Sequence, residues 1–152
     1  MPVRLSHESR LRSREHGIVL LLALAAPLAL LALGLFLEPD PRGWGTHEQL
    51  GFRPCWPMTH WNVPCPGCGV TTAVALAAHG RPLESLRTQP FGLVLLAGAL
   101  SMSLWALAGH VQRRDRYADL SGLPWKRLGS TLALLASFAW LYKLALVRGW
   151  GG

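Results

Sequence analysis

The chain has 152 residues, of which 51% are hydrophobic and only 15% charged, and it carries a formal net charge of +7. An average soluble domain is about 25% charged, so this composition favours a membrane protein of one domain. No nucleic-acid recognition motif accompanies the positive charge, and anionic lipid headgroups explain it better. We therefore expect the lipid bilayer as a partner and exclude nucleic acid.

Three long apolar stretches predict an all-α membrane protein with three transmembrane helices, at residues 17–37, 91–111 and 128–147. About 20 apolar residues in a helix cross the hydrocarbon core. A cleavable signal peptide is the alternative for the first stretch, but that stretch is longer than the usual apolar region of roughly 7–15 residues. Lys143 lies near the end of the third stretch, where its long side chain is expected to reach the membrane interface rather than serve a buried site.

Basic residues predict the orientation. Four arginines lie in a tail at residues 1–16, and further basic residues lie in a loop at residues 112–127. Both segments are predicted to be cytoplasmic, because short loops rich in Lys and Arg stay inside. Residues 38–90 then form an outer connection, and residues 148–152 form a short outer tail.

The outer connection begins with residues 38–64, which are rich in Pro, Gly and Trp and show no helical or strand period. Residues 71–79 predict a short helix, with Thr71 or Thr72 as its N-cap and Gly80 at its end. This helix is too short to cross a bilayer, so it is expected to be re-entrant or interfacial. Residues 82–88 predict another short amphipathic turn.

All three cysteines lie in this connection: Cys65 and Cys68 form a C-P-G-C-G motif, and Cys55 precedes it. The paired thiols of Cys65 and Cys68 can form a disulfide or cycle between dithiol and disulfide. The βαβ frame of thioredoxin-like proteins is not evident around them. A disulfide from Cys55 to either partner, or three reduced thiols packed among tryptophans, are the purely structural alternatives.

A zinc site is the third interpretation of the same residues. Pro66, Gly67 and Gly69 allow backbone N–H groups to turn toward the sulfurs, as in rubredoxin-like knuckles. Zinc prefers four Cys or His ligands in a tetrahedron. The candidate ligands are Cys55, Cys65, Cys68 and His60, with His47 or His79 as substitutes for the histidine. A single CxxC motif leaves metal, disulfide and redox chemistry all open.

The order of these features resembles the bacterial membrane protein family called domain of unknown function 2752. The resemblance covers about residues 50–110 and rests on Cys55, the C-P-G-C-G motif, Thr71, a short helix and Pro90 before an apolar stretch. The family pattern C-P-x-C-G-x-T-R-A has an arginine where this chain has Thr72. It also has an asparagine where this chain has Gln89. If that arginine binds an anion in relatives, Arg81 or Arg87 is its expected replacement here.

No catalytic motif of a known enzyme class is present, and the carboxylates of the connection show no paired spacing. The leading hypothesis is a non-enzymatic small membrane protein that serves as a subunit or partner of another membrane protein. The alternative is a zinc-binding or thiol-redox membrane protein acting through Cys55, Cys65 and Cys68. The expected location is the bacterial inner membrane, with several crossings and a cytoplasmic N-terminus.

Overall fold

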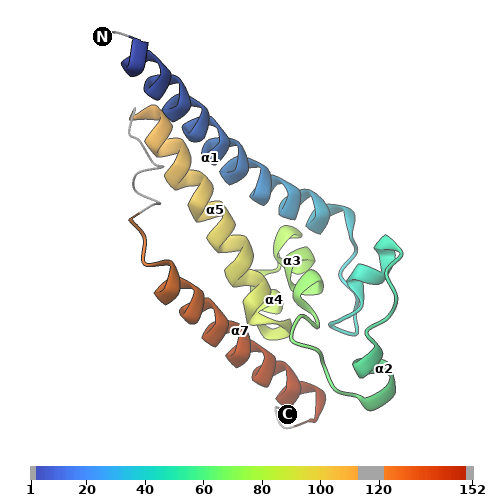
Figure 1. Ribbon diagram of the computed structural model, residues 1–152. Helices are drawn as coiled ribbons and strands as arrows, with labels where there is room; N and C mark the ends of the chain where they lie inside the picture. The colour runs from blue at the N-terminus through green and yellow to red at the C-terminus, as the bar shows by residue number, and fades with distance from the viewer. Residues whose placement is uncertain (1–2, 113–121, 150–152) are drawn as a thin grey trace.

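The computed structural model describes residues 3–112 and 122–149, and every regular element in these ranges is helical (Figure 1). The elements are α1 (Val3–Phe36), a 3-10 helix η1 (Thr46–Leu50), α2 (Trp56–Trp61), α3 (Val70–Ala78), α4 (Pro82–Thr88), α5 (Pro90–Val111) and α7 (Trp125–Val147). The predicted all-α class is confirmed. Parts of the predicted basic tail, basic loop and C-terminal tail lie outside the described residues.

Two helices of the described ranges, α5 and α7, are long and apolar enough to cross a membrane. The prediction of three such helices is therefore wrong for the first stretch. Helix α1 begins at Val3, within the basic segment, and its apolar part in the described residues is Leu20–Phe36. At 1.5 Å per residue this part is about 25 Å long, which is shorter than a hydrocarbon core of roughly 30 Å.

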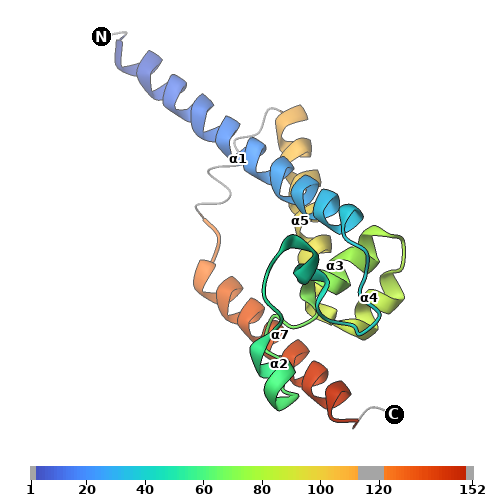
Figure 2. The same ribbon diagram turned by 90° about the vertical axis from the view of Figure 1, so that its right-hand side faces the viewer.

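Helices α1 and α5 lie side by side, and α3 packs against both of them at one end (Figures 1 and 2). Two glycines permit this close packing. A Cβ atom on Gly34 of α1 would lie 2.7 Å from Cβ of Ala78, and one on Gly92 of α5 would lie 2.6 Å from Cβ of Ala73. The hydroxyl of Ser103 on α5 also donates a hydrogen bond to a carbonyl of α1. Helix α3 is thus the packed centre of this end of the molecule.

The short helix after the C-P-G-C-G motif is confirmed as α3, and Gly80 adopts the expected left-handed conformation at its end, with φ 74°. The N–H of Gly80 donates to the carbonyl of Ala77, and the N–H of Arg81 donates to that of Leu76, which is the Schellman arrangement. Ala73 is fully buried, so α3 is a core helix of the protein.

The predicted threonine cap of this helix is wrong. Gly69 occupies the N-cap position with φ 86°, and no side chain caps the helix. Helix α3 begins at Val70, so Thr71 and Thr72 already belong to its first turn. The Thr72 hydroxyl lies 2.8 Å from that of Thr46 instead, and both side chains are fully buried.

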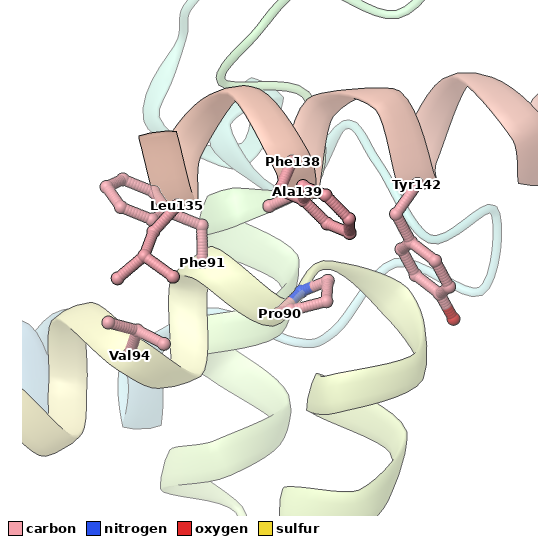
Figure 3. A pocket seen from close by; sticks show the side chains of 7 residues that line it. All are labelled: Pro90, Phe91, Val94, Leu135, Phe138, Ala139 and Tyr142. Carbon is pink, nitrogen blue, oxygen red and sulfur yellow. The ribbon is translucent and has the colours of Figure 1, made fainter. Parts of the chain in front are cut away.

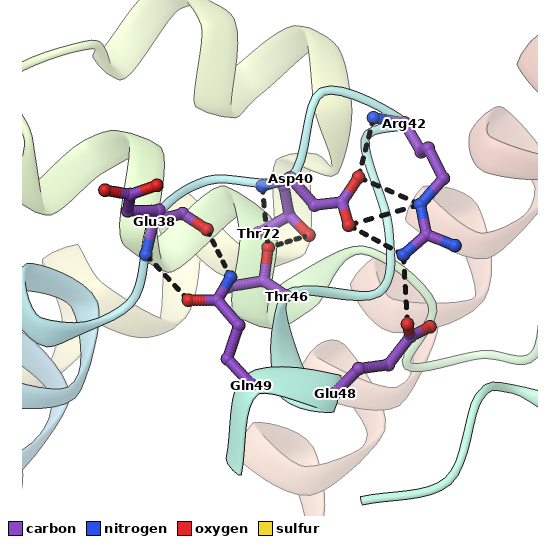
Figure 4. Close-up of polar contacts among 7 residues, drawn as sticks. All are labelled: Glu38, Asp40, Arg42, Thr46, Glu48, Gln49 and Thr72. Carbon is purple, nitrogen blue, oxygen red and sulfur yellow. Dashed lines mark hydrogen bonds and ion pairs between the residues drawn. The ribbon is translucent and has the colours of Figure 1, made fainter. Parts of the chain in front are cut away.

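The segment between α1 and α2 is ordered by polar side chains, although its sequence has no period (Figure 4). Arg42 forms ion pairs with Asp40 (2.7 Å) and Glu48 (3.0 Å). The Gln49 side chain bonds both backbone groups of Glu38, accepting from its N–H and donating to its carbonyl. These contacts fold the segment back toward α3, where the hydroxyl pair already described holds η1 in place.

Helix α7 makes few contacts with α5 and is attached mainly to the connection. Three of its side chains donate hydrogen bonds to backbone carbonyls: Trp140 to Pro64 (2.8 Å), Tyr142 to Arg87 (2.9 Å), and Lys143 to Gly43 (2.9 Å) and Thr88 (3.1 Å). Lys143 is only 5% exposed. Backbone carbonyls receive its amine inside the protein, and the expected position of this amine at the membrane interface stays a prediction.

Candidate metal site

The sulfur atoms of Cys55, Cys65 and Cys68 converge, and all three lie within 4.8 Å of one another. All three are free thiols. Cys68 is buried, and the other two are half-buried. The sequence placed Cys55 ten residues from the motif, and only the folded connection brings it to the pair.

A tight turn brings Cys65 and Cys68 together. The N–H of Cys68 donates to the carbonyl of Cys65 at 2.9 Å, which closes the turn, and the N–H of Val70 then donates to Gly67 at 3.2 Å. Gly69 is required at the next position for two reasons. Its φ of 86° is left-handed, and a Cβ there would lie 2.7 Å from the carbonyl oxygen of Gly43.

Cys55 reaches the cluster from the start of α2. It occupies the N-cap position, and its carbonyl accepts a 3.0 Å hydrogen bond from the N–H of Thr59. The first turn of a helix leaves backbone N–H groups without intrahelical partners. One of these, on Met58, donates to the Cys55 sulfur, and the N–H of Gly67 donates to the Cys65 sulfur.

The three thiols shift one another's proton affinity. Burial, together with the neighbouring Cys55 and Cys65 sulfurs, raises the pKa of Cys68 to about 12, although the Lys143 ammonium opposes the rise. Burial and hydrogen bonding to Cys55 also raise the pKa of Cys65. Burial opposes ionisation of Cys55 too, but hydrogen bonds from Met58 and Cys65 outweigh it and lower its pKa. The cluster therefore disfavours more than one negative charge unless a cation joins it.

Lys143 is the residue at this site that sequence reasoning missed. Its amine lies against the turn, since a Cβ on Gly69 would be 3.3 Å from the lysine nitrogen. In the described residues no carboxylate forms an ion pair with it, and its hydrogen-bond partners are the carbonyls of Gly43 and Thr88. A single lysine inside an apolar helix was the available signal, because such residues are expensive in a membrane.

None of the predicted histidine ligands joins the three cysteines among the described residues. The ring of His60 stacks on Trp56 with centroids 4.8 Å apart, and its Nδ1 lies 3.0 Å from the Thr59 hydroxyl. The ring of His79 lies 2.9 Å from the carbonyl of Ala75 on its own helix. His47 lies on η1 and is likewise outside the group.

The remaining motif residues have structural positions. Pro66 and Gly67 are exposed in the turn, and Thr71 is half-buried on α3. Thr72 stands where the family pattern has arginine, and it is fully buried against Thr46. Gln89 stands where the pattern has asparagine. It is also fully buried, and its side-chain amide has no hydrogen-bond partner among the described residues.

The sulfur geometry suits a thiophilic metal ion. Zinc–sulfur bonds of about 2.3 Å in a tetrahedron place sulfur atoms roughly 3.8 Å apart. The three sulfurs, at most 4.8 Å apart, need to contract by about 1 Å or less to reach that spacing. The cluster thus supplies three ligands from two segments of the chain, with the lysine ammonium beside them.

The fold and the cluster together define a small helical protein with a three-cysteine site between α2 and α3. Residues 55–103 match the model of the family described as "Protein of unknown function (DUF2752)". This segment contains all three cysteines, α3, α4 and the first part of α5, and it confirms the family resemblance predicted from the motif. No curated protein and no solved structure matches the chain.

Proposed function

We propose that this protein is a membrane protein that holds a divalent thiophilic metal ion, zinc by its ligand preference, at Cys55, Cys65 and Cys68. The observation that carries the proposal is the convergence of three sulfurs rather than two. A disulfide uses two sulfurs and leaves the third cysteine without a role. A metal ion uses all three, because thiolates are the preferred ligands of zinc.

Charge supports the same conclusion. The folded cluster raises the pKa of both Cys65 and Cys68, so the fold alone does not stabilise three thiolates. A bound divalent cation reverses this situation, since a coordinating thiol loses its proton. Three thiolates and one divalent ion together carry a single negative charge. The buried ammonium of Lys143, next to Cys68, balances that charge.

The number of ligands bears on the role of the metal. Structural zinc sites have four protein ligands, whereas three protein ligands leave one position for water or another donor. The described residues supply three. We propose that the fourth ligand is water or a side chain of a partner membrane protein, which agrees with a non-enzymatic subunit as the role of the chain.

The placement in the membrane is also part of the proposal. Helices α5 and α7 are the two candidate spans, and the cysteine cluster lies at the end of the molecule where α5 begins and α7 ends. The basic N-terminal part of α1 lies at the opposite end (Figure 1). Basic segments remain cytoplasmic. We therefore propose a bacterial inner-membrane protein with the cluster at the outer surface.

Metal analysis of protein purified in detergent without added chelator tests the proposal. We expect about one zinc per chain in the native protein and almost none in Cys65→Ser, because two remaining thiolates hold zinc weakly. His60→Ala is the matched control, and it retains its metal if the histidine is not a ligand. A native protein without metal, whose thiols resist alkylation until reduced, would refute the metal site.

One observation favours a second candidate, which is thiol–disulfide exchange. The pKa of Cys55 is lowered while that of its two neighbours is raised, so one sulfur is the better nucleophile beside a CxxC pair. Alkylation of thiols in intact cells under reducing and oxidising growth conditions distinguishes the candidates. A redox protein changes its alkylation pattern between these conditions, whereas a metal site keeps it and loses protection only when a chelator is added.

A further inference from the structure

Two neighbouring cavities form a seam beside α7, the first against residues 90–94 and the second against residues 87–88 and 41–44 of the connection. The first has a volume of about 210 Å³ and is apolar, with Phe91 and Val94 on one side and Leu135, Phe138 and Tyr142 on the other (Figure 3). The second has a volume of about 420 Å³ and lies at the C-terminal end of α7. Its lining includes Arg87, Thr88, Lys143 and Val147.

The two cavities have no lining residue in common, but their linings are adjacent in sequence at two places. Thr88 lines the polar cavity and Pro90 lines the apolar one, so they lie next to each other along the chain. On α7, Tyr142 lines the apolar cavity and Lys143 the polar one. The Tyr142 hydroxyl donates to the carbonyl of Arg87 at 2.9 Å, which marks the junction. The seam therefore changes from apolar to cationic within about one helical turn.

Arg87 is the cation of the polar cavity that is available to an anion among the described residues. Arg87 is exposed and forms no ion pair among the described residues, and its charge acts on Glu84 at longer range. The Lys143 ammonium has three N–H donors, of which two bond the carbonyls of Gly43 and Thr88. Arg42 also lines this cavity, but its charge is already paired with two carboxylates. No acidic side chain is among the described residues that line the cavity.

The positions of the two cavities along α7 indicate which kind of anion the polar cavity would bind. The polar cavity lies at the end of α7, which is the depth of lipid headgroups if α7 spans the membrane, and the apolar cavity lies toward the middle of the span. A cleft that opens into the hydrocarbon core fills with an acyl chain, because an empty cleft forfeits dispersion contacts. Arginine and lysine at the interface attract anionic headgroups.

We propose that this seam is a binding site for one anionic phospholipid. Its phosphate contacts Arg87, and one acyl chain lies in the apolar cavity beside Phe138 and Tyr142. The proposal rests on the membrane-spanning role of α5 and α7 within the proposed function, and it does not depend on the metal.

Native mass spectrometry of protein released from bilayers tests the headgroup contact. The bilayers contain equal amounts of phosphatidylglycerol and phosphatidylcholine with identical chains. We expect the native protein to retain phosphatidylglycerol about tenfold over phosphatidylcholine, and Arg87→Gln to retain both equally, since one charge-assisted contact accounts for a change of that size. Arg81→Gln is the matched control. That arginine is equally exposed and one short helix away, but it is paired with Glu84 and does not line the cavity.

A second pair of variants tests the acyl chain. Val94→Phe adds bulk inside the apolar cavity and should lower retention of the phospholipid severalfold, whereas Val111→Phe adds the same bulk at an exposed site on the same helix, outside the cavity. Equal retention of the phospholipid by both variants would overturn the placement of the acyl chain in the apolar cavity. Retention without a headgroup preference would overturn the anion site. Thermal stabilisation by inorganic phosphate alone, abolished in Arg87→Gln, would overturn the phospholipid as the occupant of that site. Failure of the proposed function is detected separately. Absence of metal in the same samples would contradict the metal site, and failure of the protein to enter bilayers would contradict its membrane-spanning role.

Discussion

Substitution of Gly92 by alanine should separate α3 from α5 and so disturb the cluster. A Cβ atom at this position would lie 2.6 Å from Cβ of Ala73 and 2.9 Å from the carbonyl oxygen of Val70. Both atoms are fixed to the backbone of α3, so no side-chain rotation relieves the contact. Gly98 lies on the same helix, and a Cβ there would meet nothing within 4 Å.

The size of the effect follows from these distances. Carbon atoms pack at about 3.5–4.0 Å, so the helices must move apart by about 1 Å, and overpacking of this kind costs about 1–3 kcal/mol. Gly98→Ala has no such cost and gains up to about 1 kcal/mol in helix propensity. We therefore expect the two variants to differ by roughly 2 kcal/mol in the free energy of unfolding. In a chain of this length the difference corresponds to about 4–8 °C in Tm.

Thermal unfolding in detergent, followed by circular dichroism, measures the difference, and zinc content of the same samples reports on the cluster. Gly92→Ala should unfold at the lower temperature and retain less metal, since α3 begins directly after the cysteine turn. If Gly92→Ala and Gly98→Ala unfold at the same temperature, the close contact between α3 and α5 does not exist.

Three further outcomes are expected. At neutral pH the raised pKa values of Cys65 and Cys68 keep both thiols protonated, so metal binding releases at least two protons. Zinc affinity, measured by competition with a chelator, should therefore rise about a hundredfold per pH unit between about pH 6 and 8. An affinity that does not change with pH would contradict this. Thr72→Val removes the hydroxyl that lies against the buried Thr46 hydroxyl, and it should lower the free energy of unfolding, measured by denaturant titration, by about 1–2 kcal/mol. An unchanged unfolding midpoint would mean that the hydroxyl pair is not formed. Gln89→Met removes a buried amide without a partner and should leave stability equal or raise it by about 1–3 kcal/mol; a clear loss would reveal a partner for that amide.

Much of this protein follows from local sequence patterns. The apolar stretches predict α5 and α7 to within a few residues, Gly80 predicts the end of α3, and Pro90 marks the start of α5. The C-P-G-C-G spacing predicts the turn that joins Cys65 to Cys68, and the segment that contains it, residues 55–103, matches the family model. These features depend on residues close together in the chain, so backbone preference and short-range hydrogen bonds are sufficient to determine them.

The tertiary structure decided the rest. Cys55 joins the pair because α2 folds back, and Lys143 faces the turn because α7 docks on the connection through hydrogen bonds to carbonyls. Thr72 caps nothing because Gly69 is the N-cap and the helix begins at Val70, which places that threonine in the first turn beside Thr46. Contacts between distant segments depend on which surfaces pack together, and no periodicity or spacing along the chain encodes them. The sequence by itself therefore determined the helices and the motif, whereas packing decided that three thiols and one ammonium form a single site.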